Sequence, residues 1–148
     1  MRQRCSGRGP LTARPKTTNR TPAPSRVRLQ RVPEFSIKGK ISEALQCGPF
    51  LVDHGRAVAG LNDSRNARRT FVAIGAANEI ALGFCSPVSL AQLSRILAGG
   101  KIGGDLKIER ALNLDGGSSS AFWFQDGDEP FSIPEQKTVR DFVAIVPR

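Results

Sequence analysis

The chain has 148 residues, of which 39% are apolar and 24% are charged, and its formal net charge at pH 7 is +9. This length fits one domain with one core and disfavours a second domain. No run approaches the roughly 18 apolar residues of a membrane span, and no apolar segment follows the basic start as in a signal peptide. As written, the sequence predicts no transmembrane segment and no export, as for a cytoplasmic chain, but the localisation stays open because the natural start is not fixed.

The net positive charge comes from the N-terminus alone. Residues 1–31 contain nine Lys or Arg and no Asp or Glu, whereas residues 32–148 contain thirteen of each sign. The first segment is also rich in Pro, Ser, Thr and Gly, with too few apolar residues to offset the entropy of ordering. We therefore predict a disordered basic tail over 1–31 and a folded domain over 32–148.

The tail is interpreted as a solvated extension or as an arm that binds nucleic acid or an anionic membrane through its charge. No specific nucleic-acid partner is predicted, because aromatic residues are not interleaved with the charges. Binding by such an arm would depend steeply on salt and would disappear when residues 1–31 are deleted.

The folded part begins with short strands. An apolar run at 50–52 lies between turns and predicts a strand, and a second short strand is predicted at 57–61. The polar, basic stretch 62–69 predicts a loop. Two apolar runs, 70–75 and 79–84, are joined by three residues and predict a β-hairpin.

A helix is predicted next. Ser89 and Gln92 have the spacing of a capping box, and Val88 and Leu93 that of a hydrophobic staple. Its apolar residues fall on one face, and two glycines end it. These are Leu90, Leu93, Ile96 and Leu97, followed by Gly99 and Gly100.

The remaining elements are a loop over 101–109, a strand over 110–114 and an apolar segment, Ala121 to Phe124, that returns to the core. A polar turn follows at 125–130, and the β-branched run Thr138 to Val146 predicts a largely buried final strand. One amphipathic helix between hairpins indicates an α+β fold with a mixed or antiparallel sheet.

Few residues suggest metal or cofactor chemistry. The three cysteines, Cys5, Cys47 and Cys85, are odd in number and lack ligand spacing, so neither a disulfide framework nor a zinc site is predicted, and the last two are interpreted as core residues. The acidic residues of the 125–130 turn lack the spacing of a calcium loop. His54, the only histidine, is expected in an exposed turn, and no cofactor or metal is predicted.

The segment Ala111 to Ser120, with the sequence ALNLDGGSSS, carries the strongest functional signal. A strand ends at one carboxylate, Asp115, and two glycines and three serines follow it. The glycines allow close approach of a ligand, and the hydroxyls and backbone amides supply hydrogen-bond donors. A turn-forming Asp before Gly is the structural alternative.

These segments together resemble the phosphodiester glycosidase family, which includes the mammalian enzyme that uncovers mannose 6-phosphate by removing N-acetylglucosamine and bacterial exopolysaccharide-associated proteins. The resemblance extends over residues 47–146. It is carried mainly by ALNLDGGSSS, which is similar to the family's ALNLDGGGSS. Weaker matches occur at 48–52, 69–75, 87–97 and 140–146. An upstream segment similar to Asn-Gly-Gly-Phe, usual in the family, is not found before residue 46, so the N-terminal part is expected to be missing.

The resemblance implies hydrolysis of a sugar-1-phosphodiester at the anomeric C–O bond, which releases a free sugar and a phosphomonoester. The expected partner is a sugar-phosphate or glycan substrate, and the oligomeric state stays open. Asp115 is predicted to act as nucleophile, general base or electrostatic stabiliser, and Arg69 to grip the phosphate, with Arg65 and Arg68 as weaker candidates. The predicted substrate-binding residues are Asn113, on the same side of the strand as Asp115, and Gly116, Gly117, Ser118 and Ser119.

Two alternatives remain. Arg69 could be a charge at the start of a strand, paired with Asp63 or Glu79, and such surface pairs contribute little. The whole chain could be a catalytically inactive remnant that binds a glycan or a phosphate.

Overall fold

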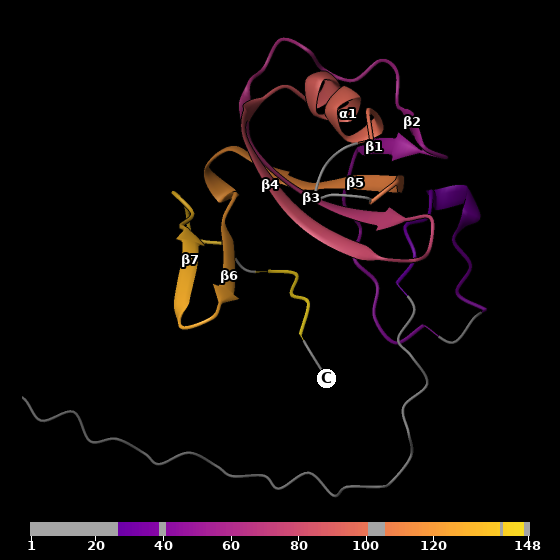
Figure 1. Cartoon of the computed structure of the whole chain (residues 1–148). Helices are drawn as coiled ribbons and strands as arrows, with labels where there is room; N and C mark the ends of the chain where they lie inside the picture. Colours follow the sequence, from indigo (N-terminus) through magenta and orange to yellow (C-terminus); the bar gives the residue numbers. More distant parts are fainter. Residues whose placement is uncertain (1–26, 39–40, 101–105, 140, 147–148) are drawn as a thin grey trace, which may run out of the picture.

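The structure is a computed structural model that describes residues 27–38, 41–100, 106–139 and 141–146. Most of the predicted tail and most of the predicted loop at 101–109 therefore lie outside the described residues. The described residues form a five-stranded antiparallel sheet with one α-helix on it, and a separate two-stranded hairpin (Figure 1). The predicted α+β fold class is confirmed.

The five strands of the main sheet lie in the order β2-β1-β5-β3-β4. They are β1 (Phe50–Asp53), β2 (Arg56–Ala57), β3 (Ala67–Gly75), β4 (Ile80–Val88) and β5 (Ile108–Gly116). The helix α1 is Leu90–Ala98, and the hairpin consists of β6 (Phe122–Asp126) and β7 (Glu129–Ile133). Two 3-10 turns, η1 (Val32–Glu34) and η2 (Gly117–Ser119), complete the described elements.

The turn between β1 and β2 is formed by His54 and Gly55, both with positive φ, 50° and 70°. Positive φ at both central residues gives the twist that a tight hairpin needs. The His54 side chain is 71% exposed, as predicted. The second strand is shorter than the predicted 57–61. The predicted 62–69 loop is wrong at its end because β3 begins at Ala67 and pairs with β4 and β5.

The predicted hairpin and helix are confirmed. β3 and β4 pair antiparallel, from Ala67 with Val88 to Ile74 with Ile80. At the start of α1 the Ser89 side chain accepts from the Gln92 backbone N–H, and the Gln92 side chain accepts from Ser89 N–H. This reciprocal cap satisfies two donors that a helix start leaves unpaired.

One face of the sheet is covered by α1. Leu93 and Leu97 on the helix are fully buried against Leu51 on β1, and the Ser94 hydroxyl donates to the Leu51 carbonyl at 2.6 Å. Cys85 packs against the edge of this cluster, as predicted. Burial of these aliphatic side chains supplies much of the stability of this half of the domain.

The opposite face has a smaller buried cluster. Val72 and Leu112 pack there with Leu29, which comes from the segment preceding η1, and Cys47 packs against the same cluster. The partly buried Leu114 completes this side towards the end of β5. The two clusters place β3 and β5 at the centre of the fold, with apolar neighbours on both faces.

Two predictions for the C-terminal part are wrong. Ala121 to Phe124 does not return to the core, because β6 pairs only with β7, and Trp123 and Phe124 are 62% and 41% exposed. The described residues of Thr138 to Val146 contain no strand, and Phe142 is 88% exposed. A β-branched sequence becomes a buried strand only where a neighbouring strand supplies hydrogen bonds and packing, and this segment has no such partner among the described residues.

Candidate active site

A β-bulge sets the direction of the side chains at the end of β5. On β3, Thr70 pairs with Asp115, and the next residue, Phe71, pairs with Asn113, so Leu114 is an extra residue on β5. Successive residues of β3 point to opposite faces, and their partners on β5 follow them. Asp115 therefore shares the face of Thr70, and Asn113 shares that of Phe71. The prediction that both face the same side is wrong because the bulge inserts one residue.

Asn113 is buried, with 5% of its surface exposed. Its side chain donates to the Gly48 carbonyl at 3.2 Å, and its backbone N–H donates to the Pro49 carbonyl at 2.9 Å. Both bonds tie β5 to the turn that precedes β1. The contacts of Asn113 are thus those of a residue that holds two strands in register.

Asp115 is exposed at the end of β5. Its carboxylate accepts from the Gly116 backbone N–H at 2.6 Å, and the Thr70 hydroxyl lies 3.5 Å from the Asp115 backbone carbonyl. Within the described ranges the carboxylate forms no ion pair. The charge at this position is therefore open to a ligand.

Arg69 pairs through its backbone with Gly116 and is itself buried, with 9% of its surface exposed. The guanidinium donates from Nε to the Val88 carbonyl at 3.4 Å and from Nη2 to the Arg65 carbonyl at 3.2 Å. Burial and, secondly, the charge of Arg65 lower the pKa of Arg69 below its ordinary value. Because Arg69 neighbours Thr70 on β3, its side chain leaves the sheet on the face opposite to Asp115.

The Arg69 guanidinium lies directly against the backbone of Gly116. A Cβ atom at position 116 would lie 2.6 Å from Nη1 of Arg69, so any larger residue there must displace the guanidinium. Nη1 makes no hydrogen bond to another described residue. The alternative pairings of Arg69 are not formed, since Asp63 contacts Ser89 and Arg95, and the Glu79 carboxylate accepts from the Ala77 N–H.

The residues after β5 form the short turn η2. Gly117 has φ +71°, a conformation that favours glycine, and no atom lies within 4 Å of where its Cβ would be. The Ser118 carbonyl accepts from two consecutive backbone N–H groups, those of Gln136 at 2.8 Å and Lys137 at 3.1 Å. The turn is thereby attached to the segment that follows the hairpin.

A groove of about 460 Å³ lies beside this turn. Of the predicted site residues, Asp115 and Ser119 line it, whereas Arg69, Asn113, Gly116, Gly117 and Ser118 do not. Sequence reasoning missed several further lining residues with polar, charged or aromatic side chains, among them Thr70, Phe122, Lys137 and Asp141. Thr70 follows Arg69 directly, but no sequence signal places Lys137 or Asp141 here, because Lys137 precedes and Asp141 lies within a run that resembles a buried strand.

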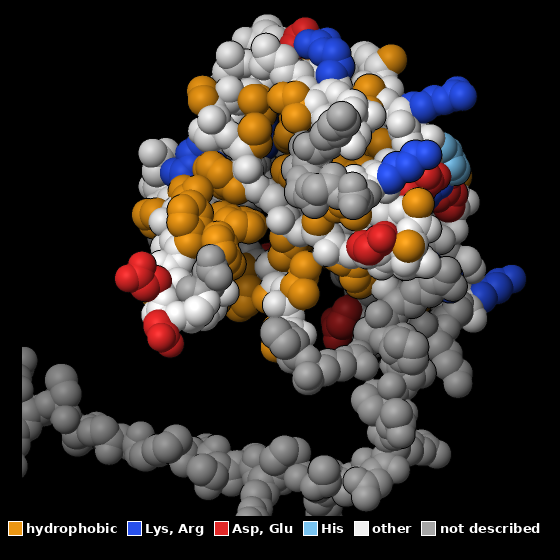
Figure 2. All heavy atoms as spheres, viewed as in Figure 1, with side chains coloured by type: hydrophobic (Ala, Val, Ile, Leu, Met, Phe, Trp, Pro, Cys, Tyr) orange, Lys and Arg blue, Asp and Glu red, His pale blue; other side chains and the backbone are white. Residues whose placement is uncertain are grey.

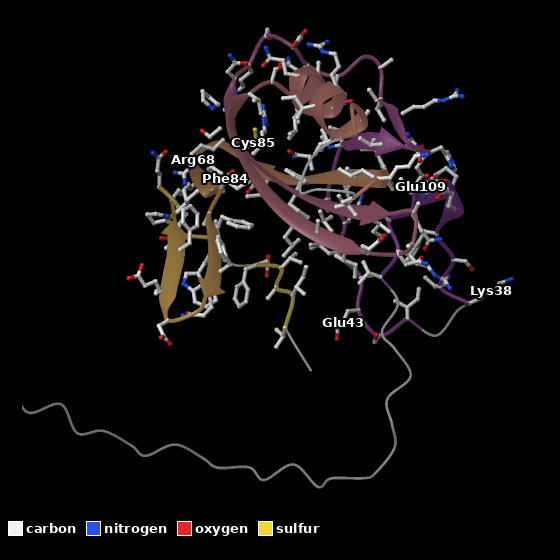
Figure 3. The ribbon with its side chains drawn as sticks, viewed as in Figure 1. Lys38, Glu43, Arg68, Phe84, Cys85 and Glu109 are labelled. Atoms are coloured by element: carbon white, nitrogen blue, oxygen red, sulfur yellow. The ribbon has the colours of Figure 1, made fainter. Side chains whose placement is uncertain are left out.

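Arg68, one of the weaker candidates, lies on the other side of β3 from Arg69. It donates from Nη2 to the Pro134 carbonyl at 2.7 Å, and its guanidinium carbon lies 5.3 Å from the centre of the Phe84 ring (Figure 3). These contacts join β4 to the end of the hairpin. The third arginine, Arg65, is exposed and accepts from Arg69 through its backbone.

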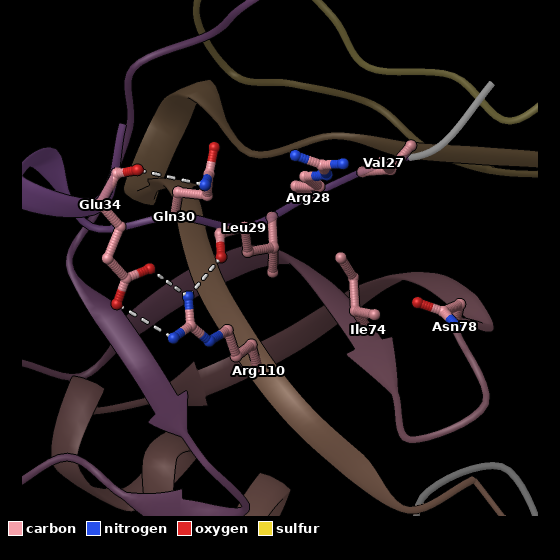
Figure 4. A pocket seen from close by; sticks show the side chains of 8 residues that line it. All are labelled: Val27, Arg28, Leu29, Gln30, Glu34, Ile74, Asn78 and Arg110. Atoms are coloured by element: carbon pink, nitrogen blue, oxygen red, sulfur yellow. Dashed lines mark hydrogen bonds and ion pairs between the residues drawn. The ribbon is translucent and has the colours of Figure 1, made fainter. Parts of the chain in front are cut away.

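A second hollow, of about 310 Å³, lies at the other end of β5 (Figure 4). Arg110 donates to both carboxylate oxygens of Glu34, at 2.6 and 3.1 Å, and to the Leu29 carbonyl at 2.7 Å. The Arg110 guanidinium also pairs with Asp53 at 3.2 Å. Its charge is therefore compensated within the protein, which makes this hollow a poorer candidate for a charged substrate.

Two further classes of site can be addressed for the described residues. Among them no group of three or more His, Cys, Asp or Glu side chains could hold a metal ion. The described part of the chain also contains no helix with the length and apolar character that crossing a membrane requires.

Comparison with known proteins adds one match. A search of curated proteins and a search of solved structures found no matching protein. The family model for phosphodiester glycosidases matches residues 9–146, and so begins well upstream of the 47–146 region on which the resemblance in sequence rests. Since this match covers nearly the whole chain, including the Asp115 turn and the groove, the chain belongs to the phosphodiester glycosidase family.

Proposed function

We propose that this protein hydrolyses a sugar-1-phosphodiester at the anomeric C–O bond and releases a free sugar and a phosphomonoester. The observation that carries the proposal is the position of Asp115, an exposed carboxylate without an ion pair to any described residue, on a groove of about 460 Å³. A glycosidic bond breaks through an oxocarbenium-like transition state, which a nearby carboxylate stabilises.

In this proposal Asp115 acts at the anomeric carbon. It attacks the carbon as a nucleophile, activates a water molecule as a general base, or stabilises the positive charge that develops on the sugar. A phosphomonoester is a good leaving group, so its departure depends more on stabilisation of the phosphate charge than on protonation by an acid.

The phosphate is held by donors around the η2 turn. Arg69, on the opposite face, acts through the turn itself: its Nη1 lies against the Gly116 backbone, has no hydrogen bond to a described residue, and adds positive charge behind the phosphate. The Gly117 amide and the Ser118 and Ser119 hydroxyls complete the donor set, while the Gly116 amide orients the Asp115 carboxylate to which it donates. Lys137, on the groove wall, supplies a second cation, and Asn113 positions β5 through its bonds to the Gly48–Pro49 turn.

The decisive experiment identifies the bond that breaks. The purified protein is incubated with the methyl phosphodiester of N-acetylglucosamine 1-phosphate in ¹⁸O-labelled water, and the products are analysed by mass spectrometry. Cleavage at the anomeric carbon places ¹⁸O in the sugar, whereas cleavage at phosphorus places it in the phosphate. Label in the phosphate would overturn the proposed reaction. A nucleotide sugar is tested as a second substrate, because the protein could require an aglycone larger than methyl.

The alternative is a protein that binds glycan or phosphate without hydrolysis. The burial of Arg69, which is turned to the face opposite Asp115, favours this alternative. It predicts saturable binding of the same diesters, weakened in Lys137→Gln, with no sugar released from any of them. Release of sugar that is lost in Asp115→Asn would exclude it.

A further inference from the structure

We infer that the β6–β7 hairpin binds an apolar group carried on the phosphate of the substrate, so that the preferred diesters have an alkyl or isoprenoid-like aglycone. This inference rests on the hydrolysis proposed at Asp115 and names the class of its substrate. It is carried by one apolar face of the hairpin that is continuous with the groove.

The pairing of the hairpin separates its side chains into two faces. Phe122 pairs with Ile133, and Phe124 pairs with Phe131, whereas Trp123 pairs with Ser132. Because side chains alternate along each strand, the first two pairs share one face and the third lies on the other. The first face therefore has four neighbouring apolar side chains, of which Phe122 lines the groove.

These side chains form a continuous row. The ring centres of Phe122 and Phe124 are 5.9 Å apart, and those of Phe124 and Phe131 are 5.2 Å apart. Phe122 lines the groove together with Asp115, whereas Phe124 and Phe131 remain 41% and 47% exposed. Figure 2 shows apolar side chains gathered over the hairpin and around the hollow beside it. A substrate held at Asp115 can thus extend along an apolar surface.

The groove itself has one polar and one apolar part. Asp115, Ser119 and Lys137 can serve the sugar and the phosphate. The rest of the lining includes the polar side chains of Gln46, Thr70, Thr138 and Asp141. It also has an apolar part, which includes Leu45, Leu82, Leu114, Ala121, Phe122, Val139, Phe142 and Val143. A second sugar on the apolar part and the hairpin face would bury hydroxyl groups against side chains that cannot hydrogen-bond, which is unfavourable. An alkyl chain there gains free energy with each methylene that it buries.

The first test measures binding without catalysis. Methyl phosphate and hexyl phosphate are titrated into the full-length protein, and their dissociation constants are obtained from NMR chemical shifts. Full burial of a methylene strengthens binding about fourfold, so even partial burial of the hexyl chain should make it bind at least about tenfold more tightly than the methyl compound. Equal affinity for the two compounds would overturn the inference.

Two neighbouring residues of β6 give a matched pair of variants. Phe124→Thr removes an aromatic ring from the apolar face, and Trp123→Thr removes one from the opposite face, while threonine suits a strand in both. We expect the first variant to reduce the hexyl preference to about threefold or less with methyl phosphate binding unchanged, and the second to retain the preference. A preference that is equally reduced in both variants would overturn the inference. Phe131→Thr, on the partner strand, repeats the test if Phe124→Thr fails to fold.

A second test separates this inference from the proposed reaction. If methyl and hexyl diesters of N-acetylglucosamine 1-phosphate are hydrolysed with the same kcat/KM, the reaction stands and the apolar subsite is overturned. If neither diester is hydrolysed but the hexyl preference in binding is lost in Phe124→Thr, the subsite stands and the reaction is overturned. Sedimentation tests whether a second copy of the chain covers the hairpin instead. A wild-type dimer that becomes a monomer in Phe124→Thr, together with equal binding of methyl and hexyl phosphate, would assign the hairpin to a dimer interface and overturn the inference.

Discussion

The two ends of β5 differ in whether their charged side chains are paired with opposite charges. At the end that begins with Ile108, the Arg110 guanidinium is held by Glu34 and Asp53, and Arg31 adds a second bond to Asp53 at 2.7 Å. At the other end, the Asp115 carboxylate is exposed and has no counter-ion in the described part of the chain. Both ends lie beside a hollow of several hundred Å³.

This difference separates a structural end from a candidate functional end. Charges that compensate one another inside the protein contribute to stability and leave little interaction for a ligand, whereas an uncompensated carboxylate on a groove is available to positive charge that develops on a bound substrate. Replacement of residues at one end should therefore change stability, and replacement at the other should change activity.

The largest expected effect is on the open end. Asp115→Asn keeps the oxygen that accepts from the Gly116 N–H but removes the charge. We expect kcat/KM for a sugar-1-phosphodiester to fall at least about a hundredfold, equivalent to about 2.7 kcal/mol, while the free energy of unfolding changes by less than about 0.5 kcal/mol. Asp128→Asn, on an exposed hairpin turn, is the control and should retain activity. Retained activity in Asp115→Asn would remove the functional assignment of this end.

Gly116→Ala should lower stability although it lies at the open end, because it places a methyl group against Arg69. The backbone itself tolerates alanine, since φ at Gly116 is −154°. Displacement of the guanidinium should reduce the free energy of unfolding by about 1 to 3 kcal/mol, measured by urea denaturation. In an Arg69→Ala background the same substitution should cost much less, and additive costs would contradict the contact.

Gly117→Ala is the comparison for that steric effect. The space around this residue is open, but its φ of +71° is unfavourable for alanine. We expect a cost of about 1 kcal/mol from the backbone alone, and this cost should be the same with or without Arg69.

At the compensated end, Arg110→Met should lower stability without a direct effect on catalysis. The substitution removes the two hydrogen bonds from Arg110 to the Glu34 carboxylate and the ion pair between Arg110 and Asp53. We expect the free energy of unfolding to fall by about 1 to 3 kcal/mol, and kcat/KM to change less than threefold. Arg56→Met, on the exposed strand β2, should change neither quantity.

The smallest expected effect is a dependence on acid. Two hydrogen bonds from Arg110 lower the pKa of Glu34 from 4.5 to about 2. Since the folded state has the lower pKa, this carboxylate contributes stability above its ordinary pKa, and the contribution is lost as the pH falls from 4.5 through 2. The urea midpoint should therefore fall less between pH 5 and pH 2.5 in Glu34→Gln than in the wild type. The same acid dependence in both proteins would refute the contribution of Glu34.

Local sequence signals predicted the helix and the inner strands well. The Ser89–Gln92 cap and the two apolar runs of the β3–β4 hairpin depend on residues that are near one another in the chain, and these interactions are visible in the sequence. The Asp115 carboxylate was also correctly placed at the end of a strand, because burial stops where the polar residues begin.

The sequence did not reveal what depends on distant partners. The bulge at Leu114 is defined by the register with β3, and it turns Asn113 away from the face of Asp115. The segments 121–124 and 138–146 have the composition of buried strands, but the main sheet does not pair with their described residues, so their apolar side chains remain at the surface. Apolar composition alone does not distinguish a core strand from an exposed apolar wall.

The two bonds accepted by the Ser118 carbonyl give the site a mechanical property. They attach the turn after Asp115 to the backbone of Gln136 and Lys137, and Lys137 lies on the wall of the groove. A substrate that pulls the turn inward would carry the Lys137 backbone with it, so the groove would narrow from both sides in one motion. The turn after Asp115 and the groove wall at Lys137 would then move together when a ligand binds, without a separate hinge.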